Sequence, residues 1–505
     1  MRIFQPVVVR RKKLFMIPFS YFEYYLIFVP LTVGIYWFLA SIRKDRRTIA
    51  AKAAILIASL LFYAWLNPVY LPLLLVSIFA NFAVFRFFRS QYAQRPSLKK
   101  TILAFGICLN VALLAYFKYM DFFIGTVNTI ADARLPLLKI AFPIGISFYT
   151  FVQIAFLVDA YRSTIHQNPF LDYAIFVSFF PKVVSGPIVY HHELVPQLSD
   201  EKSRRPSYEA IARGLFLVSV GLFKKVVIAD NLALWATQGF DHAAKLTLFE
   251  AWFASLSFIL QVYFDFSGYT DMALGTALFF NIRLPINFDA PYKSKSIQEL
   301  WRRWHITLMR FLRDYIYIPL GGSRLGELRT CVNIVIIFII GGFWHGPAWT
   351  FIVWGLCNGI AMIVYRYWRK AKLRLPAFLG WLITFNFFHI SGVFFRATSF
   401  ESVWKIYRGL FGLEGVMLPQ GWSKLSFLAK AGIQFGPWLA NLGDRHSYLI
   451  WFIAAGLIIS TLGKNSMELA ERLRPNLRWA IFTAFLLGVS IIHMTKVTEF
   501  IYANF

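Results

Sequence analysis

The stretch CVNIVIIFIIGGFWHG, residues 331–346, decides the fold. Its apolar run from Cys331 to Trp344 contains 14 residues. At about 1.5 Å per residue, a helix of that length reaches ~21 Å into a hydrocarbon layer that is ~30 Å thick. His345, the next residue, is therefore expected inside the membrane, where an ionisable side chain is unfavourable unless it faces a cavity or a partner. The stretch predicts a membrane fold and a candidate site together.

The composition extends this conclusion to the whole chain. Of the 505 residues, 58% are hydrophobic and 15% are charged, and the mean hydropathy is +0.57. A single water-soluble core stops growing near ~250–300 residues, so lipid must surround much of this apolar surface. We therefore predict an all-α, polytopic membrane protein. The three cysteines lie in or beside apolar stretches, and we expect no disulfide framework from them.

The net charge of +27 would suggest nucleic-acid binding in a soluble protein. In a protein with many spans, however, basic residues collect in cytoplasmic loops and face anionic lipid headgroups. We expect membrane lipids as partners and no nucleic acid.

Apolar runs of about 20 residues mark the expected spans. There are about 12 of them, at residues 24–41, 53–67, 69–85, 101–117, 140–158, 213–233, 248–280, 331–345, 347–365, 377–395, 448–463 and 479–495. Two apolar segments, 170–190 and 297–320, contain prolines, glycines or arginines that are badly suited to spanning. Irregular backbone at membrane depth survives only when it is buried in protein or lines a wet cavity, so we interpret both as re-entrant or interfacial.

Basic loops orient these spans. Clusters within 43–52 and 86–100 are expected in the cytoplasm, which places both termini outside. Four basic residues at 10–13 conflict with that orientation, so residues 1–15 are interpreted as an extension or a mis-assigned start. Residues 16–505 are then expected to form a single transmembrane domain.

His345 is the first candidate catalytic residue. Gly341, Gly342, Gly346 and Pro347 loosen the helix around it, and Trp344 and Trp349 are expected to wall it. A desolvated imidazole stays neutral and can accept a proton from a hydroxyl or a thiol. The alternative is a buried histidine that only hydrogen-bonds a neighbouring carbonyl.

A second polar cluster reads YFDFSGYTD, residues 263–271, and contains Asp265, Ser267 and Asp271. Two carboxylates in lipid need partners, so we expect them to pair with arginines of the following basic segment or to line a cavity. An ion-pair lock between helices is at least as good an interpretation as catalysis.

The third cluster is WRRWH, residues 301–305. Arg302 and Arg303 are candidates for binding the phosphates of a donor, although anchoring to lipid headgroups is the simpler explanation. His305 adds a titratable group. His389, inside a span, either lines a cavity or makes an interhelical hydrogen bond, and we favour the hydrogen bond.

Several catalytic motifs are missing from the sequence: a GxxxxGK[ST] phosphate loop, HExxH, CxxC and GxSxG. ATP-driven pumping, zinc proteolysis and serine hydrolysis are therefore disfavoured, and we expect no metal and no bound cofactor.

The sequence resembles the membrane-bound O-acyltransferases, in particular the bacterial subgroup of alginate O-acetylation and D-alanyl-transfer membrane proteins. The matching stretches lie densely between residues 140 and 400: FPIGISFYTF (142–151), DAYR (159–162), FFPKVVSGPIV (179–189), QVYFDFSGYTDMALG (261–275), NFDAPYKSKSIQELWRRWHITLMRFLRDYIYIPLGGSR (287–324), GGFWHG (341–346) and GVFFRA (392–397). The resemblance implies a helical barrel or funnel with a tunnel. It also implies that His345 is the principal catalytic histidine and His305 the second, with Asp265, Ser267, Asp271, Trp304 and Trp344 as supporting or tunnel residues.

The resemblance further implies a reaction. A short acyl group, acetyl in the first place, would pass from a cytoplasmic thioester such as acetyl-CoA to an exported polysaccharide, through an extracytoplasmic SGNH-type partner, at the inner membrane of a bacterium. One alternative is D-alanyl transfer from a carrier protein. Two others, a histidine-dependent transporter and a non-catalytic scaffold, remain open.

The C-terminal stretch FIYANF, residues 500–505, resembles the FIYFQF-type ending of the acetylating branch, although Ala503 and Asn504 depart from it. In the related D-alanyl system a tyrosine in a similar ending carries the acyl group, and that tyrosine corresponds to Tyr502. We expect Tyr502 either to carry the acyl group or to plug the funnel by aromatic packing.

Overall fold

The computed structural model describes residues 22–42, 47–90, 95–165, 168–200, 205–424, 427, 430, 432–443, 446–474 and 476–494. Helices predominate among them, and the expectation of an all-α polytopic protein is confirmed. One short parallel pair joins β1 (Met417–Pro419) to β2 (Gln434–Gly436), with Leu418 opposite Phe435. The residues form two compact units, 22–214 with Ala273–Leu284, and Leu215–Met272 with Pro285–His493. The expected extension, residues 1–15, lies outside the described residues.

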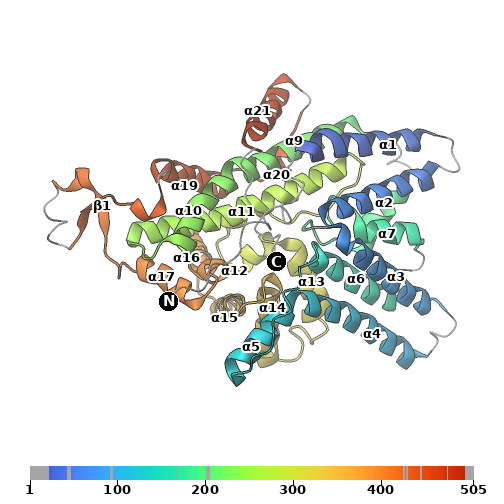
Figure 1. Ribbon diagram of the computed structural model, residues 1–505, viewed down its shortest axis with the longest axis horizontal. Helices are drawn as coiled ribbons and strands as arrows, with labels where there is room; N and C mark the ends of the chain where they lie inside the picture. The colour runs from blue at the N-terminus through green and yellow to red at the C-terminus, as the bar shows by residue number, and fades with distance from the viewer. Residues whose placement is uncertain are drawn as a thin grey trace. The chain divides into compact units, whose positions relative to one another are not determined.

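The first unit is built from apolar helices that pack in neighbouring pairs. Its elements are η2 (Tyr24–Phe28), α1 (Val29–Ser41), α2 (Arg47–Leu66), η3 (Pro68–Tyr70), α3 (Leu71–Phe88), α4 (Pro96–Leu114), η5 (Ala115–Tyr119), α5 (Met120–Ala131), α6 (Ile146–Tyr161), α7 (Phe170–Ser178) and α8 (His191–Ser199). Helix α1 packs on α2, α2 packs on α7, and α4 packs on α6 (Figure 1). A buried ion pair of 2.7 Å between Lys52 and Asp172 joins α2 to α7.

The irregular segment expected within 170–190 is present in this unit. Helix α7 ends at Ser178, and residues 179–190 follow as buried, non-helical backbone. Gly145 begins α6 with a φ of +76°, and a Cβ there would lie 2.5 Å from the carbonyl oxygen of Val183. Glycine therefore lets α6 start directly against the irregular segment. The surrounding protein buries this backbone, as a non-helical segment at membrane depth requires.

The remaining elements belong mostly to the second unit. They are α9 (Tyr208–Leu222), η7 (Phe223–Ala229), α10 (Asp230–Thr237), η8 (Gln238–His242), α11 (Leu248–Leu278), η9 (Pro291–Lys293), α12 (Ile297–Arg303), α13 (Ile306–Leu312), η10 (Arg313–Tyr317), α14 (Glu327–His345), α15 (Trp349–Lys370), α16 (Ala377–Arg396), α17 (Phe400–Leu410), η11 (Gln420–Trp422), η12 (Ala440–Leu442), α19 (His446–Thr461), α20 (Ser466–Glu471) and α21 (Leu477–His493). The segment 297–320 is broken into α12, α13 and η10, as its composition predicts.

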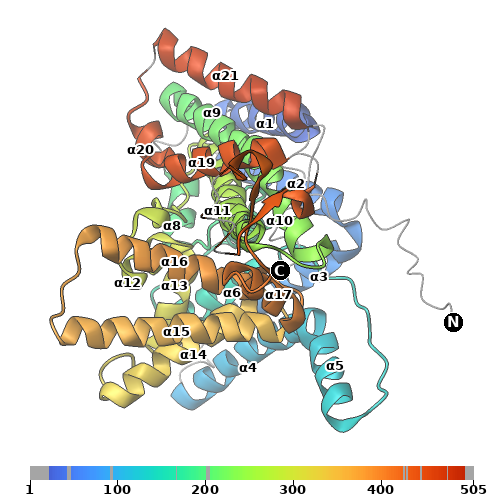
Figure 2. The same cartoon turned by 90° about the vertical axis from the view of Figure 1, so that its left-hand side faces the viewer.

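Three long helices of this unit, α14, α15 and α16, lie side by side (Figure 2). Glycines permit the close approach of α14 and α15, because a Cβ on Gly342 would lie 2.3 Å from the carbonyl oxygen of Phe351. Likewise, a Cβ on Gly355 would lie 2.4 Å from the carbonyl oxygen of Phe338. Helix α14 ends at His345, where Gly346 is extended and is followed by Pro347.

Membrane-spanning character is distributed along the chain. Within the described ranges, seven helices are long and apolar enough to cross a membrane: Tyr24–Ser41, Ile49–Leu66, Pro68–Phe88, Pro96–Ala131, Glu327–His345, Trp349–Lys370 and Ala377–Arg396. Three shorter apolar helices, Ile146–Tyr161, Ser447–Thr461 and Leu477–His493, fall where further spans are expected. The expected spans at 213–233 and 248–280 also fall on helical residues, in the run from α9 to α10 and in α11. The cysteines Cys108, Cys331 and Cys357 are free.

Candidate active site

His345 is the last residue of α14, and its side chain is buried, with an exposed fraction of 3%. Three aromatic rings enclose the imidazole: the ring centroids of Trp344, Trp354 and Phe395 lie 4.9, 5.5 and 5.0 Å away. The sequence analysis expected Trp344 beside His345 but did not identify Trp354 or Phe395. Trp349, which was expected to be a wall, is half exposed.

His305 lies between α12 and α13 in the left-handed conformation, with φ +44° and ψ +52°. This conformation is uncommon outside glycine, although histidine adopts it more readily than most residues. It breaks the helix at this point and buries the imidazole completely. The ring centroid lies 4.7 Å from that of Phe266 on α11.

The two imidazoles share one site within the second unit. Their ring centroids are 6.3 Å apart, and Trp344 contacts both rings, at 6.0 Å from His305 and 4.9 Å from His345. The fold therefore brings together a histidine from the junction of α12 and α13 and a histidine from the end of α14. Their catalytic role stays a prediction.

Asn287 holds His305 and was missed by the sequence analysis. Its Oδ1 lies 3.3 Å from Nδ1 of His305, and the same oxygen accepts hydrogen bonds from Thr307 Oγ1 at 2.7 Å and Thr307 N at 3.3 Å. A backbone N–H can only donate, so the amide must turn its oxygen to this side. The Nδ1 of His305 is then the donor. The signal in the sequence was the asparagine that opens NFDAPY, a stretch that was used only as a family match.

The lone pair of His305 is consequently on Nε2, which has no hydrogen-bond partner among the described residues. Complete burial disfavours the charged imidazolium of His305, so the ring is neutral near pH 7. A neutral imidazole with a defined acceptor nitrogen is suited to taking a proton. Because His305 is fully buried and His345 nearly so, a substrate reaches the pair only after neighbouring side chains move. The tunnel stays a prediction.

Comparison with known proteins decides the family. Residues 14–400 match the family model described as MBOAT, membrane-bound O-acyltransferase family. The chain belongs to this family. It is a multi-pass membrane acyltransferase, and the resemblance found in its motifs is confirmed.

The relatives of this O-acyltransferase include three kinds of enzyme. A peptidoglycan O-acetyltransferase of Helicobacter pylori is 47% identical over 421 residues, which cover 78% of this chain and 80% of the relative. A probable alginate O-acetylase AlgI of Pseudomonas aeruginosa is 36% identical over 437 residues, 83% of this chain and 78% of the relative. A teichoic acid D-alanyltransferase of Bacillus subtilis is 26% identical over 260 residues, covering 48% of this chain and 66% of the relative.

The acidic cluster of this O-acyltransferase forms ion pairs. Asp265 lies 2.9 Å from the Nζ of Lys225, which also contacts Asp230 at 2.8 Å. Asp271 lies 2.7 Å from Lys224 Nζ. Both aspartates of α11 therefore pair with lysines of η7, the preceding helical segment, whereas the sequence predicted arginines of the following basic segment or a cavity lining. These ion pairs join α11 to η7, in agreement with the interpretation of the cluster as ion pairs between helices.

The other expected supporting residues occupy different positions. Ser267 is buried on α11, and its hydroxyl has no hydrogen-bond partner in the described part of the chain. Trp304 packs among Phe288, Tyr292 and Phe388, with ring centroids at 5.1, 5.9 and 5.1 Å. It therefore supports the segment just before His305, whereas Trp344 contacts both imidazoles directly.

The two candidate donor-binding arginines differ. Arg303 is engaged by Asp289 at 3.3 Å and by Glu299 at 3.1 Å. Arg302 is exposed and makes no ion pair with any described residue. Of the two, Arg302 is therefore the one available to an incoming phosphate.

His389 makes the interhelical hydrogen bond that the sequence favoured. Its Nε2 lies 2.8 Å from Ser255 Oγ and joins α16 to α11. The Ser255 hydroxyl donates to the carbonyl oxygen of Ala251 at 2.7 Å, so it accepts from His389.

Tyr502 and the tail 500–505 lie outside the described residues. Among those that are described, no group of three or more His, Cys, Asp or Glu side chains could hold a metal ion.

Proposed function

We propose that this O-acyltransferase transfers an acetyl group from acetyl-CoA, as donor substrate, toward a hydroxyl group of an exported cell-envelope polysaccharide. The observation that carries the proposal is the buried pair of imidazoles, His305 and His345, with ring centroids 6.3 Å apart behind aromatic walls. Such a site suits a thioester, because bulk water that would hydrolyse it is kept away.

The chemistry needs no oxidant, metal or cofactor. The acceptor hydroxyl oxygen attacks the thioester carbonyl carbon, an ester C–O bond forms, and the C–S bond breaks. His345 takes the hydroxyl proton and returns it to the departing thiolate, so the products are an ester and a free thiol. Positioned proton transfer of this kind contributes about 10²–10⁴-fold in rate. His305, oriented by Asn287, places a second proton acceptor beside the reacting groups.

The choice of acetyl rests on the relatives. The two relatives named as O-acetyl enzymes are 47% and 36% identical over more than three quarters of this chain. The one named as a D-alanyltransferase is 26% identical over 48% of it. Peptidoglycan is the first acceptor to test and an alginate-like exopolysaccharide the second. D-alanyl transfer from a carrier protein is the alternative.

The enzyme would act in the inner membrane of a bacterium. Its donor would arrive from the cytoplasm, where the basic segment that includes Arg302 is expected and where a guanidinium suits the phosphates of CoA. An SGNH-type partner outside the membrane would take the acetyl group onward, either directly or after transfer to Tyr502.

The test uses membrane vesicles containing the full chain, incubated with acetyl-CoA labelled in the acetyl group, and measures base-labile acetate both on the chain itself and on added peptidoglycan or alginate. A parallel reaction supplies a D-alanyl carrier protein instead. The proposal expects transfer from acetyl-CoA, and its loss in His345→Ala at unchanged thermal stability. Transfer from the D-alanyl carrier alone, or undiminished transfer by His345→Ala, would overturn it.

A further inference from the structure

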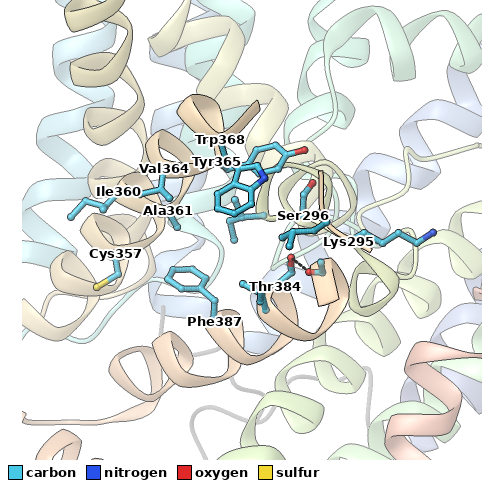
Figure 3. Close-up of a pocket in the computed structure, with 14 residues that line it drawn as sticks. Lys295, Ser296, Cys357, Ile360, Ala361, Val364, Tyr365, Trp368, Thr384 and Phe387 are labelled. Carbon is cyan, nitrogen blue, oxygen red and sulfur yellow. Dashed lines mark hydrogen bonds between the residues drawn. The ribbon is translucent and has the colours of Figure 1, made fainter. Parts of the chain in front are cut away.

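An apolar groove lies within the second unit, between α15, α16 and the turn that precedes α12 (Figure 3). Its volume is about 500 Å³, within the range of ~300–1,000 Å³ typical of ligand pockets. Ile360, Val364 and Trp368 line it from α15, and Ile383 and Phe387 line it from α16. None of the residues assigned above to acyl transfer lines this groove.

The groove opens sideways, toward the surface of the spanning helices. Ile360, Val364 and Ile383 have exposed fractions of 49%, 58% and 58%. Both α15 and α16 are long and apolar enough to cross a membrane. Large side chains of this kind stay exposed on a spanning helix because hydrocarbon covers them, so the groove faces lipid chains.

One end of the groove is cationic. The stem of Lys295 lines the groove, and its ammonium group points outward, away from Tyr365 and Trp368 (Figure 3). The loop after α15 reads Lys372-Leu373-Arg374-Leu375, with all four residues exposed and Leu375 lining the groove. Alternating basic and apolar exposed residues are suited to the boundary between headgroups and acyl chains.

These cations are available to an anion. Other basic residues at the end of α15 are occupied, since Arg366 and Lys370 both contact Glu327. The nearby carboxylate of Glu299 already contacts Arg303 at 3.1 Å. For Lys295, Lys372 and Arg374, no ion pair is found among the described residues.

We propose that this groove binds an anionic glycerophospholipid, with one acyl chain between α15 and α16 and the phosphate at Lys295, Lys372 and Arg374. The apolar lining selects a hydrocarbon chain, and the cationic end selects a negatively charged headgroup over a zwitterionic one. A bilayer phospholipid provides both parts in one molecule.

The bound lipid would support the segment that carries His305. Ser296 and Ile297 line the groove and begin α12, where the Ser296 hydroxyl accepts a hydrogen bond from the backbone N–H of Glu299 at 3.2 Å. Gly380 of α16 lies against the same turn, because a Cβ there would be 2.7 Å from the carbonyl oxygen of Lys295. A chain in the groove therefore contacts the start of the helix that leads to His305.

The experiment measures lipid binding directly and does not depend on acyl transfer. The full chain is reconstituted in nanodiscs of equal phosphatidylglycerol and phosphatidylcholine and released for native mass spectrometry. Three variants accompany the wild type. Ala361→Trp fills the groove, Lys295→Gln/Lys372→Gln/Arg374→Gln removes its charge, and Ala104→Trp makes the matched substitution at an exposed position of α4.

The wild type and Ala104→Trp should retain one phosphatidylglycerol several-fold more often than phosphatidylcholine. Ala361→Trp should lose the retained lipid, and the triple variant should keep a lipid but lose the preference for the anionic one. Equal retention of the two lipids by the wild type, or unchanged retention by Ala361→Trp, overturns the proposal. If Ala361→Trp does not fold, the triple variant, altered only at exposed side chains, decides: an unchanged preference overturns the proposal.

Discussion

Asn287 and His305, 18 residues apart in the chain, meet with the amide Oδ1 of one 3.3 Å from the imidazole Nδ1 of the other. Thr307 fixes the direction of that amide through its backbone N–H and its hydroxyl. Asn287 is therefore a positioning residue, since it sets which nitrogen of His305 carries the proton and which carries the lone pair.

Replacing Asn287 by Asp should lower kcat near pH 7 by roughly 10–100-fold, the usual effect of losing an orienting partner of a functional histidine. A carboxylate beside the ring favours the imidazolium and raises the pKa of His305, so the acidic limb of the pH–rate profile should move to higher pH. Thr307→Val is the matched control, because it removes one hydrogen bond to the same amide oxygen but places no charge beside the ring, so the acidic limb should not move. An equal loss of rate at every pH would show that Asn287 is only structural.

The two histidines should act as one unit. Ala at either His305 or His345 should lower kcat by about 10²–10⁴-fold, and the double variant should be little worse than the poorer single one. Steady-state acetyl transfer, measured beside thermal stability, checks this. His389→Gln, which changes a buried histidine bonded to Ser255, should keep near wild-type activity. Multiplicative losses in the double variant would mean that the two histidines act independently.

Lys225→Met should strongly destabilise the protein. The change leaves Asp230 and Asp265 as buried carboxylates without their shared cation, and breaking a buried pair in this way costs about 3–5 kcal/mol. Asp265→Asn should cost less, because Lys225 keeps Asp230. Denaturation in mixed micelles gives both free energies of unfolding. A larger loss in Asp265→Asn than in Lys225→Met would contradict the observed pairing.

Gly355→Ala should push α14 from α15 and displace His345. The new Cβ would lie 2.4 Å from the carbonyl oxygen of Phe338, and overpacking of this kind costs about 1–3 kcal/mol. Both the melting temperature and acetyl transfer should fall. Gly488→Ala is the control: apart from the neighbouring backbone of its own helix, no described atom lies within 4 Å of the added Cβ, and alanine favours a helix by about 1 kcal/mol over glycine. Full activity in Gly355→Ala would show that the helix contact tolerates a methyl group without moving His345.

The membrane fold could be predicted from the sequence because spanning helices obey a local rule. Each needs a run of apolar residues as long as the bilayer is thick, and such runs can be counted. The irregular segment after Ser178 was predictable for a similar reason, since Pro181 and Pro187 break a helix and Gly186 weakens it. His345 was identified because the run before it is short.

The partners of the polar residues were less predictable. Asp265 and Asp271 needed cations, but the sequence did not indicate that Lys225 and Lys224 would supply them in place of later arginines. The choice depends on which helices lie side by side. The same holds for Asn287, whose amide becomes informative only when it lies against His305.

By itself, the sequence determined the class of protein, the helical segments, the family and the two histidines, because length, hydropathy and motif spacing are properties of the chain. Only the tertiary structure decided that His305 and His345 share one enclosure, that Asn287 orients one of them, and that lysines neutralise the buried aspartates. These are contacts between side chains distant in sequence, and they exist only once packing has brought their helices together.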